Sequence, residues 1–154
     1  MTGTTDVRAA AGLAATGLIG AGVLHGVWLR SPWPLETPAE LARVVVGPAG
    51  PDGGLPPKAA TAVVAGLLGA AGGLVLAGAR PESRLGRARL VRAGMWTVAG
   101  VLAARGAAGP AVSGLRLREE TPEFRRLNLR LYSPLCLGLA GLTGHVVLRT
   151  RRRA

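Results

Sequence analysis

The segment Leu127–Arg149 reads Leu-Asn-Leu-Arg-Leu-Tyr-Ser-Pro-Leu-Cys-Leu-Gly-Leu-Ala-Gly-Leu-Thr-Gly-His-Val-Val-Leu-Arg. From Leu131 to Leu148 it carries no formal charge when the histidine is neutral, and arginines close it at both ends. A helix rises about 1.5 Å per residue, so this length crosses a bilayer core of about 30 Å. The pattern therefore predicts a membrane-spanning helix over residues 131–149.

The composition of the 154-residue chain favours a membrane protein over a soluble domain. Hydrophobic residues make up 49% of the chain but aromatic residues only 3%, and there are 24 glycines. Small residues suit membrane helices, which pack by close backbone approach, and the pairs Gly22/Gly26 and Gly69/Gly73 have the spacing that allows it. The net charge of +11 comes almost entirely from arginines. Because no stacking aromatics are interleaved with these arginines, we do not expect nucleic-acid binding.

Three further apolar segments predict membrane-spanning helices, at residues 9–29, 59–79 and 90–111. The segment 9–29 is longer than a typical signal-peptide core and ends in Trp28-Leu29-Arg30, which is not a cleavage sequence. The segment 90–111 joins two apolar halves across Arg105 and should end near Pro110. We therefore expect a single all-α membrane domain, residues 1–154, built as a four-helix bundle.

Two polar connections contain signals for short helices at the membrane surface. Thr37 can cap a helix that has Pro38 at its first position, and Glu40 completes a capping box. The resulting amphipathic helix, about residues 38–46, should lie at the interface. Thr121-Pro122-Glu123 repeats the cap-and-proline start and predicts a second interfacial helix at about 122–130.

The distribution of arginines predicts the orientation in the membrane. Four spans place both termini on one side, together with the compact basic loop Arg80–Arg92 and the basic tail Arg149–Arg153. Short segments rich in Lys and Arg mark the cytoplasmic side. We expect a multi-pass protein of the cell inner (plasma) membrane with both termini in the cytoplasm.

Five residues with polar or reactive side chains should lie at one depth in such a bundle. The first and third spans end, and the fourth span begins, at the same membrane face. The residues near these ends should therefore lie at one depth: His25, Trp28, Arg105, Tyr132 and Cys136. An arginine within a span costs at least about 2.5 kcal/mol on insertion scales. It therefore either faces a partner or cavity or extends its head to the interface, and both interpretations stay open for Arg105. The inward orientation predicts a site for an anion or a polar headgroup.

The other members of this group allow chemical and purely structural interpretations. An imidazole side chain makes His25 compatible with a proton carrier or a ligand, but its place near a span end favours a hydrogen bond to a neighbouring helix or a position in the headgroups. Cys136 could act as a nucleophile if a cation stabilised its thiolate, but a small packing residue is the simpler interpretation. Tyr132 suits a headgroup anchor. No metal site is expected, because His145 lies near the opposite face, and no cofactor motif is present.

One set of motifs matches a known family. The motif Tyr132-Ser133-Pro134-Leu135-Cys136 after Arg125–Arg130, together with His25-Gly26-Val27-Trp28, resembles the small bacterial membrane proteins of the domain-of-unknown-function 3995 family. The resemblance runs from the first span to the middle of the fourth. It implies a four-helix integral membrane protein and no assigned activity. Asn128 stands where the resemblance implies an acid in many relatives.

Three functional hypotheses follow. The leading one is a non-enzymatic membrane protein that binds a lipid headgroup or a partner through His25, Trp28, Arg105 and Tyr132. The second is a small membrane enzyme that acts on a lipid-soluble substrate through Cys136 or His25. The third is one protomer of a homo-oligomeric transporter, because four short helices enclose little volume. The expected partners are membrane lipids, with no cofactor, metal or nucleic acid.

Overall fold

The computed structural model describes residues 2–47, 54–80, 82–115, 117 and 119–151, and all regular elements among them are helices. The all-α prediction is confirmed. Residues 48–53, and residues 152–153 of the predicted basic tail, lie outside the described residues. The elements are α1 (Thr2–Trp28), α2 (Pro38–Val45), α3 (Lys58–Gly78), α4 (Arg84–Arg87), α5 (Arg89–Gly114), α6 (Pro122–Leu127), the π-helical turn η1 (Asn128–Tyr132) and α7 (Ser133–Arg151).

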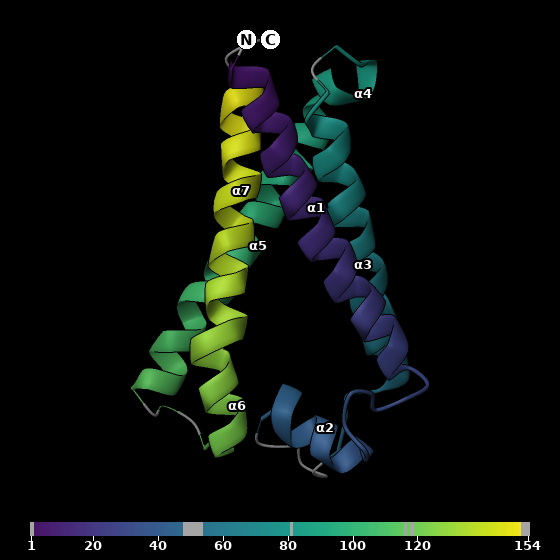
Figure 1. Cartoon of the computed structure of the whole chain (residues 1–154), viewed down its shortest axis with the longest axis vertical. Helices are drawn as coiled ribbons and strands as arrows, with labels where there is room; N and C mark the ends of the chain where they lie inside the picture. The colour runs from purple at the N-terminus through teal and green to yellow at the C-terminus, as the bar shows by residue number, and fades with distance from the viewer. Residues whose placement is uncertain (1, 48–53, 81, 116, 118, 152–154) are drawn as a thin grey trace.

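The long helices form two arms that diverge from one end of the molecule (Figure 1). The first arm is α1 with α3, and the second arm is α5 with the continuous helix α6–η1–α7. The arms converge near both chain termini and separate toward the other end, where α2 lies across the opening (Figure 1). The buried apolar core sits mainly in the converging half and is drawn from Val7, Ala10, Ala11, Ala14, Leu18, Val75, Ala79, Met95, Leu139, Val146 and Val147.

Glycines bring the helices of the first arm together. A Cβ atom on Gly22 would lie 2.9 Å from the carbonyl oxygen of Ala65, and one on Gly72 would lie 2.6 Å from a side-chain carbon of Ile19. Such close backbone approach is how membrane helices gain packing contacts. Only part of the predicted small-residue pattern takes part: a Cβ on Gly22 would also lie 3.3 Å from the backbone nitrogen of Gly69, whereas one on Gly26, Gly69 or Gly73 would meet open space.

Glycines also bring the helices of the second arm together. A Cβ on Gly106 would lie 2.7 Å from Cγ of Leu137, and one on Gly109 would collide with Oγ of Ser133. Helix α5 contains Pro110 and continues to Gly114, beyond the end that the proline predicts. Proline removes one backbone donor from a helix, but it does not have to end the helix when tertiary packing supports it.

The second interfacial helix differs from the expectation. Residues 122–130 were predicted to form an interfacial helix distinct from the span at residues 131–149, but α6, η1 and α7 follow one another without a break. A proline inside a helix clashes with the carbonyl of the residue four positions earlier, here Arg130. Because η1 winds more widely than an α-helix and includes Arg130, it lets the chain pass Pro134 without ending.

Among the residues that the structure describes, three helices are long and apolar enough to cross a membrane, by length and composition alone: Thr5–Trp28, Lys58–Gly78 and Pro122–Thr150. Helix α5 has sufficient length at 26 residues but is not among them. Its apolar residues are mostly small, and Arg105 lies within it. The predicted span at residues 90–111 is therefore not confirmed by this measure.

Candidate functional site

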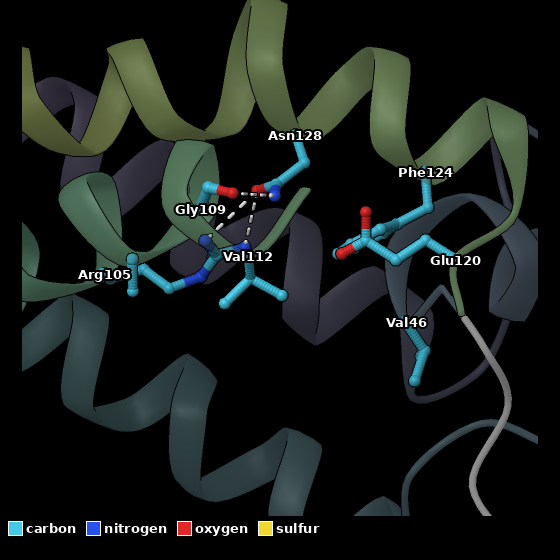
Figure 2. Close-up of a pocket in the computed structure, with 8 residues that line it drawn as sticks. Val46, Arg105, Gly109, Val112, Glu120, Phe124 and Asn128 are labelled. Carbon is cyan, nitrogen blue, oxygen red and sulfur yellow. Dashed lines mark hydrogen bonds between the residues drawn. The ribbon is translucent and has the colours of Figure 1, made fainter. Parts of the chain in front are cut away.

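Asn128 is the centre of a polar network in the second arm. It is the first residue of η1 and only 2% exposed. Its Oδ1 accepts hydrogen bonds from both Nη1 and Nη2 of Arg105, each at 3.1 Å, and from Oγ of Ser133 at 3.3 Å. Its Nδ2 donates to Oγ of Ser113 at 2.6 Å and to the carbonyl of Gly109 at 3.3 Å. One buried amide thus joins α5 to the start of α7 (Figure 2).

The spacing of residues on α5 explains how this network forms. Arg105, Gly109 and Ser113 follow one another at intervals of four, so they share one face of the helix. The bare Gly109 leaves the room in which the oxygens of Asn128 and Ser133 sit, because an added Cβ would overlap Ser133 Oγ and lie 3.0 Å from Asn128 Oδ1. The guanidinium contacts Asn128 on this face, so Arg105 has the kind of partner that the inward interpretation expects, while the residue as a whole remains exposed.

The network continues to an acid in the connection between α5 and α6. Ser113 Oγ donates to Oε1 of Glu120 at 3.0 Å, whereas Oε2 of Glu120 is buried without a hydrogen-bond partner among the described residues. Arg105, Asn128 and Glu120 line a pocket of about 240 Å³ whose apolar walls include Val46 and Phe124 (Figure 2). The pocket therefore contains a cation, an amide and an unpaired carboxylate oxygen.

Tyr132 lies in the same arm but has a structural contact that differs from the predicted headgroup anchor. Its hydroxyl donates to the carbonyl of Val44 at 3.3 Å, and Thr121 Oγ1 donates to the carbonyl of Arg43 at 2.6 Å. The last carbonyls of a helix have no partner within it. The second arm therefore caps the end of α2, and the exposed ion pair between Arg43 and Glu123 at 3.1 Å strengthens the attachment.

Cys136 is a free, half-buried thiol one helical turn beyond Tyr132. The neighbouring residue Leu137 packs against Gly106, the residue that follows Arg105, so Cys136 and Arg105 lie at the same level of the second arm. Cys136 does not line the pocket that contains Arg105. Cys136 therefore lies near the Asn128 network but takes part in none of the hydrogen bonds described for it.

His25 and Trp28 lie in the first arm and line a different pocket of about 450 Å³, whose walls are mostly apolar. His25 Nδ1 donates to the carbonyl of Ala21 at 2.8 Å, and its ring centroid is 4.9 Å from that of Trp28. Trp28 Nε1 donates to the carbonyl of Trp33 at 2.9 Å. No hydrogen bond or ring contact among the described residues joins these two side chains to Arg105. Of the five predicted residues, His25 and Trp28 therefore line one pocket and Arg105 lines another, whereas Tyr132 and Cys136 line neither; the two pockets share Val46.

Several residues of the network were not predicted from the sequence. Ser113, Glu120 and Gly109 were missed, although the four-residue spacing from Arg105 could have placed Gly109 and Ser113 on its face. Asn128 was noted only as a departure from a family pattern. The chemistry of these groups is that of hydrogen bonding and charge, and no cluster of three His, Cys, Asp or Glu residues exists among the described residues.

The comparisons with known proteins identify a family. No curated protein and no solved structure matches the chain. The model of the family described as "Protein of unknown function (DUF3995)" matches residues 18–143, a range that contains both pockets and the whole Asn128 network. The resemblance expected from the motifs around His25 and Tyr132 is thus confirmed, and the chain belongs to the DUF3995 family.

Proposed function

We propose that this protein is a non-enzymatic, multi-pass membrane protein that binds the phosphate of a phospholipid headgroup at the pocket lined by Arg105 and Asn128. The observation that carries the proposal is the orientation of Arg105. Asn128 accepts from both terminal nitrogens of the guanidinium, which fixes its plane while its remaining N–H donors stay free of described partners. A planar guanidinium with free donors suits a phosphate, which accepts several hydrogen bonds.

The outer faces of the helices support a lipid environment. Leu13 on α1, Leu67 on α3 and Val101 on α5 are each more than 60% exposed. Large apolar side chains exposed along several helices would be costly in water, whereas hydrocarbon solvates them. The apolar surface of α5 is the reason to include this helix in the membrane despite Arg105.

The course of the chain supports four spans. Both termini lie at the same end of the molecule, and α5 runs from that end to the other, where α6 begins (Figure 1). If α1, α3 and α7 all cross the bilayer, then α5 has to return the chain across it. The arginines between α3 and α5 lie at the end that contains the termini, so this end would be cytoplasmic by the positive-inside rule. A C-terminal reporter that is active only outside the cytoplasm would contradict this orientation.

The lipid site can be tested by native mass spectrometry of the full chain, purified in a mild detergent and titrated with phosphatidylethanolamine and phosphatidylglycerol of identical acyl chains. The Arg105→Gln variant removes the charge-assisted contacts to phosphate, and loss of about 1.4 kcal/mol lowers affinity about tenfold. Both lipids should therefore bind about tenfold more weakly. Arg105→Lys, which keeps the charge but not the fork, should retain an intermediate affinity.

The matched control is Arg126→Gln, which removes an exposed arginine of α6 that does not line the pocket. This variant should bind both lipids as the wild type does. Equal affinity of the wild type and Arg105→Gln for both lipids would overturn the proposed site. An equal loss of affinity in Arg105→Gln and Arg126→Gln would mean that the lipids respond to general surface charge and not to the pocket.

A second candidate function is supported by the pocket of the first arm. Because a carbonyl can only accept, the bond from His25 to Ala21 makes Nδ1 the protonated nitrogen and leaves Nε2 as an acceptor. A basic nitrogen beside mostly apolar walls is compatible with proton transfer to or from a lipid-soluble substrate. Cys136 does not share this pocket.

Separate His25→Gln and Cys136→Ser variants test this second candidate in cells that depend on the protein. If His25→Gln alone fails to support growth, at normal protein levels, the result would favour catalysis at the pocket of the first arm. Indifference to both substitutions would exclude these two side chains as catalytic residues and would favour the binding function.

A further inference from the structure

The pocket that we assign to a phosphate contains a second feature that phosphate alone does not explain. Glu120 lines the same cavity as Arg105, and its buried Oε2 has no partner among the described residues. A buried acceptor without a donor costs free energy, so such groups usually meet a bound water, ion or ligand. Glu120 therefore indicates a missing donor inside this pocket.

The two charges in the pocket are held apart and do not neutralise each other. The ion pairs of the described residues join Arg8 to Glu82 and Arg43 to Glu123, and neither involves the pocket. Arg105 and Glu120 are instead linked indirectly, through Asn128 and Ser113. In Figure 2 the two side chains enter from different sides, with Val112 between them. The network thus keeps a positive and a negative subsite within one cavity.

We propose that this pocket selects a zwitterionic headgroup that carries both a phosphate and a primary ammonium group. The phosphate contacts the guanidinium of Arg105, and the ammonium donates to Oε2 of Glu120. This inference rests on the proposed function, because it specifies the headgroup that the same site binds.

Other headgroup types satisfy the pocket less well. A purely anionic headgroup would satisfy Arg105 but would bring negative charge toward Glu120 and leave Oε2 without a donor. A quaternary ammonium has no N–H to donate to a carboxylate oxygen. The cavity of about 240 Å³ is smaller than the roughly 300–1,000 Å³ of sites for drug-sized ligands, which suits a headgroup whose acyl chains stay outside.

The same chemistry also occurs in a free phosphoethanolamine-like molecule, so the test includes both sources. The full chain in a mild detergent is titrated with phosphatidylethanolamine and phosphatidylglycerol of identical acyl chains, and binding is read by native mass spectrometry. We expect the wild type to prefer phosphatidylethanolamine by about tenfold. Soluble phosphoethanolamine is then added as a competitor. Displacement only at large excess assigns the site to the lipid, whereas displacement at equal concentration assigns it to the soluble zwitterion and overturns the lipid as its source.

The discriminating variant is Glu120→Gln, which keeps the side-chain size and an oxygen for Ser113 but loses the negative charge. It should remove the preference for phosphatidylethanolamine while leaving affinity for phosphatidylglycerol equal or higher. Glu119→Gln changes the adjacent exposed acid, which does not line the pocket, and should keep the preference.

The outcomes distinguish the ammonium subsite at Glu120 from the phosphate site at Arg105 on which it rests. An unchanged lipid preference in Glu120→Gln, with binding of both lipids still lost in Arg105→Gln, overturns the ammonium subsite and leaves the phosphate site standing. Wild-type binding of both lipids in Arg105→Gln overturns the proposed function itself. A thermal unfolding scan of each variant is included, so that a lost preference counts as support only when the variant unfolds cooperatively.

Discussion

The two arms of this molecule have the same hairpin form but are held together by different interactions. In the first arm, Gly22 and Gly72 let α1 and α3 approach closely, and no side-chain hydrogen bond joins these helices among the described residues. In the second arm, close approach at Gly106 and Gly109 is combined with a buried hydrogen-bond network centred on Asn128. Polar side chains within membrane bundles often have functional roles. The difference therefore directs the search for a ligand to the second arm.

The test with the largest expected effect is Asn128→Leu, which keeps the approximate size of the side chain but replaces the amide at the centre of the network with an apolar group. Arg105, which is exposed, would lose its acceptor, and the buried Ser113 would lose a donor. Stranding such groups should lower the free energy of unfolding by about 3 kcal/mol. Thermal unfolding in detergent, followed by tryptophan fluorescence, measures the change.

The control for Asn128→Leu is Thr97→Val, because Thr97 is exposed on α5 and bonds only to Ala93 of its own helix. This variant should change stability by less than about 0.5 kcal/mol. Equal unfolding temperatures for the two variants would mean that the network contributes nothing and that both arms depend on packing alone.

The second test asks whether the network needs the space at Gly109. An alanine there would collide with Ser133 Oγ and crowd Asn128, so Gly109→Ala should destabilise the protein by about 2 kcal/mol. Gly100→Ala on the same helix meets open space and should be neutral or stabilising by up to about 1 kcal/mol. If both substitutions were stabilising, α5 and α7 would not approach as closely as the structure has them.

The sequence predicted which end of the helices carries the candidate site residues better than it predicted which of these residues share a pocket. Counting helical rise and chain reversals placed His25, Arg105 and Tyr132 at one level, and all three lie close to the end of α2, because His25 and Arg105 line pockets that include Val46 and Tyr132 bonds to Val44. The sequence could not predict that the arms diverge there, because divergence depends on how the packing interfaces between the long helices compete. His25 therefore lines one pocket and Arg105 another.

Local signals were predicted more reliably than contacts distant in sequence. The capping box of Thr37 and Glu40 is confirmed, since each side chain bonds the other's backbone N–H. The partner of Arg105 was not predicted, because Asn128 lies 23 residues away and carries no charge that would mark it as a counterpart. The continuity of α6 with α7 was missed because a wide π-helical turn has no simple sequence signature.

The third test applies the glycine argument to the first arm. A Cβ on Gly22 would lie 2.9 Å from the carbonyl oxygen of Ala65, so the helices would have to separate by a few tenths of an ångström. Gly22→Ala should cost about 1 kcal/mol, less than Gly109→Ala because no hydrogen-bond network is displaced. Gly26→Ala, one turn away, meets open space and is the matched control. A larger loss for Gly22→Ala than for Gly109→Ala would reverse the contrast between the arms.

The smallest expected effect concerns the attachment of α2 to the second arm. Tyr132→Phe keeps the ring next to Phe124 but removes the 3.3 Å hydrogen bond to the carbonyl of Val44, a loss of about 0.5–1 kcal/mol. The effect should be local, because the core lies in the other half of the molecule. Hydrogen exchange should therefore accelerate at the amides of α2 while the unfolding temperature changes little. Unchanged exchange in α2, with weaker retention of lipid, would instead favour a role for the Tyr132 hydroxyl in the headgroup layer, as a tyrosine at a span end predicts.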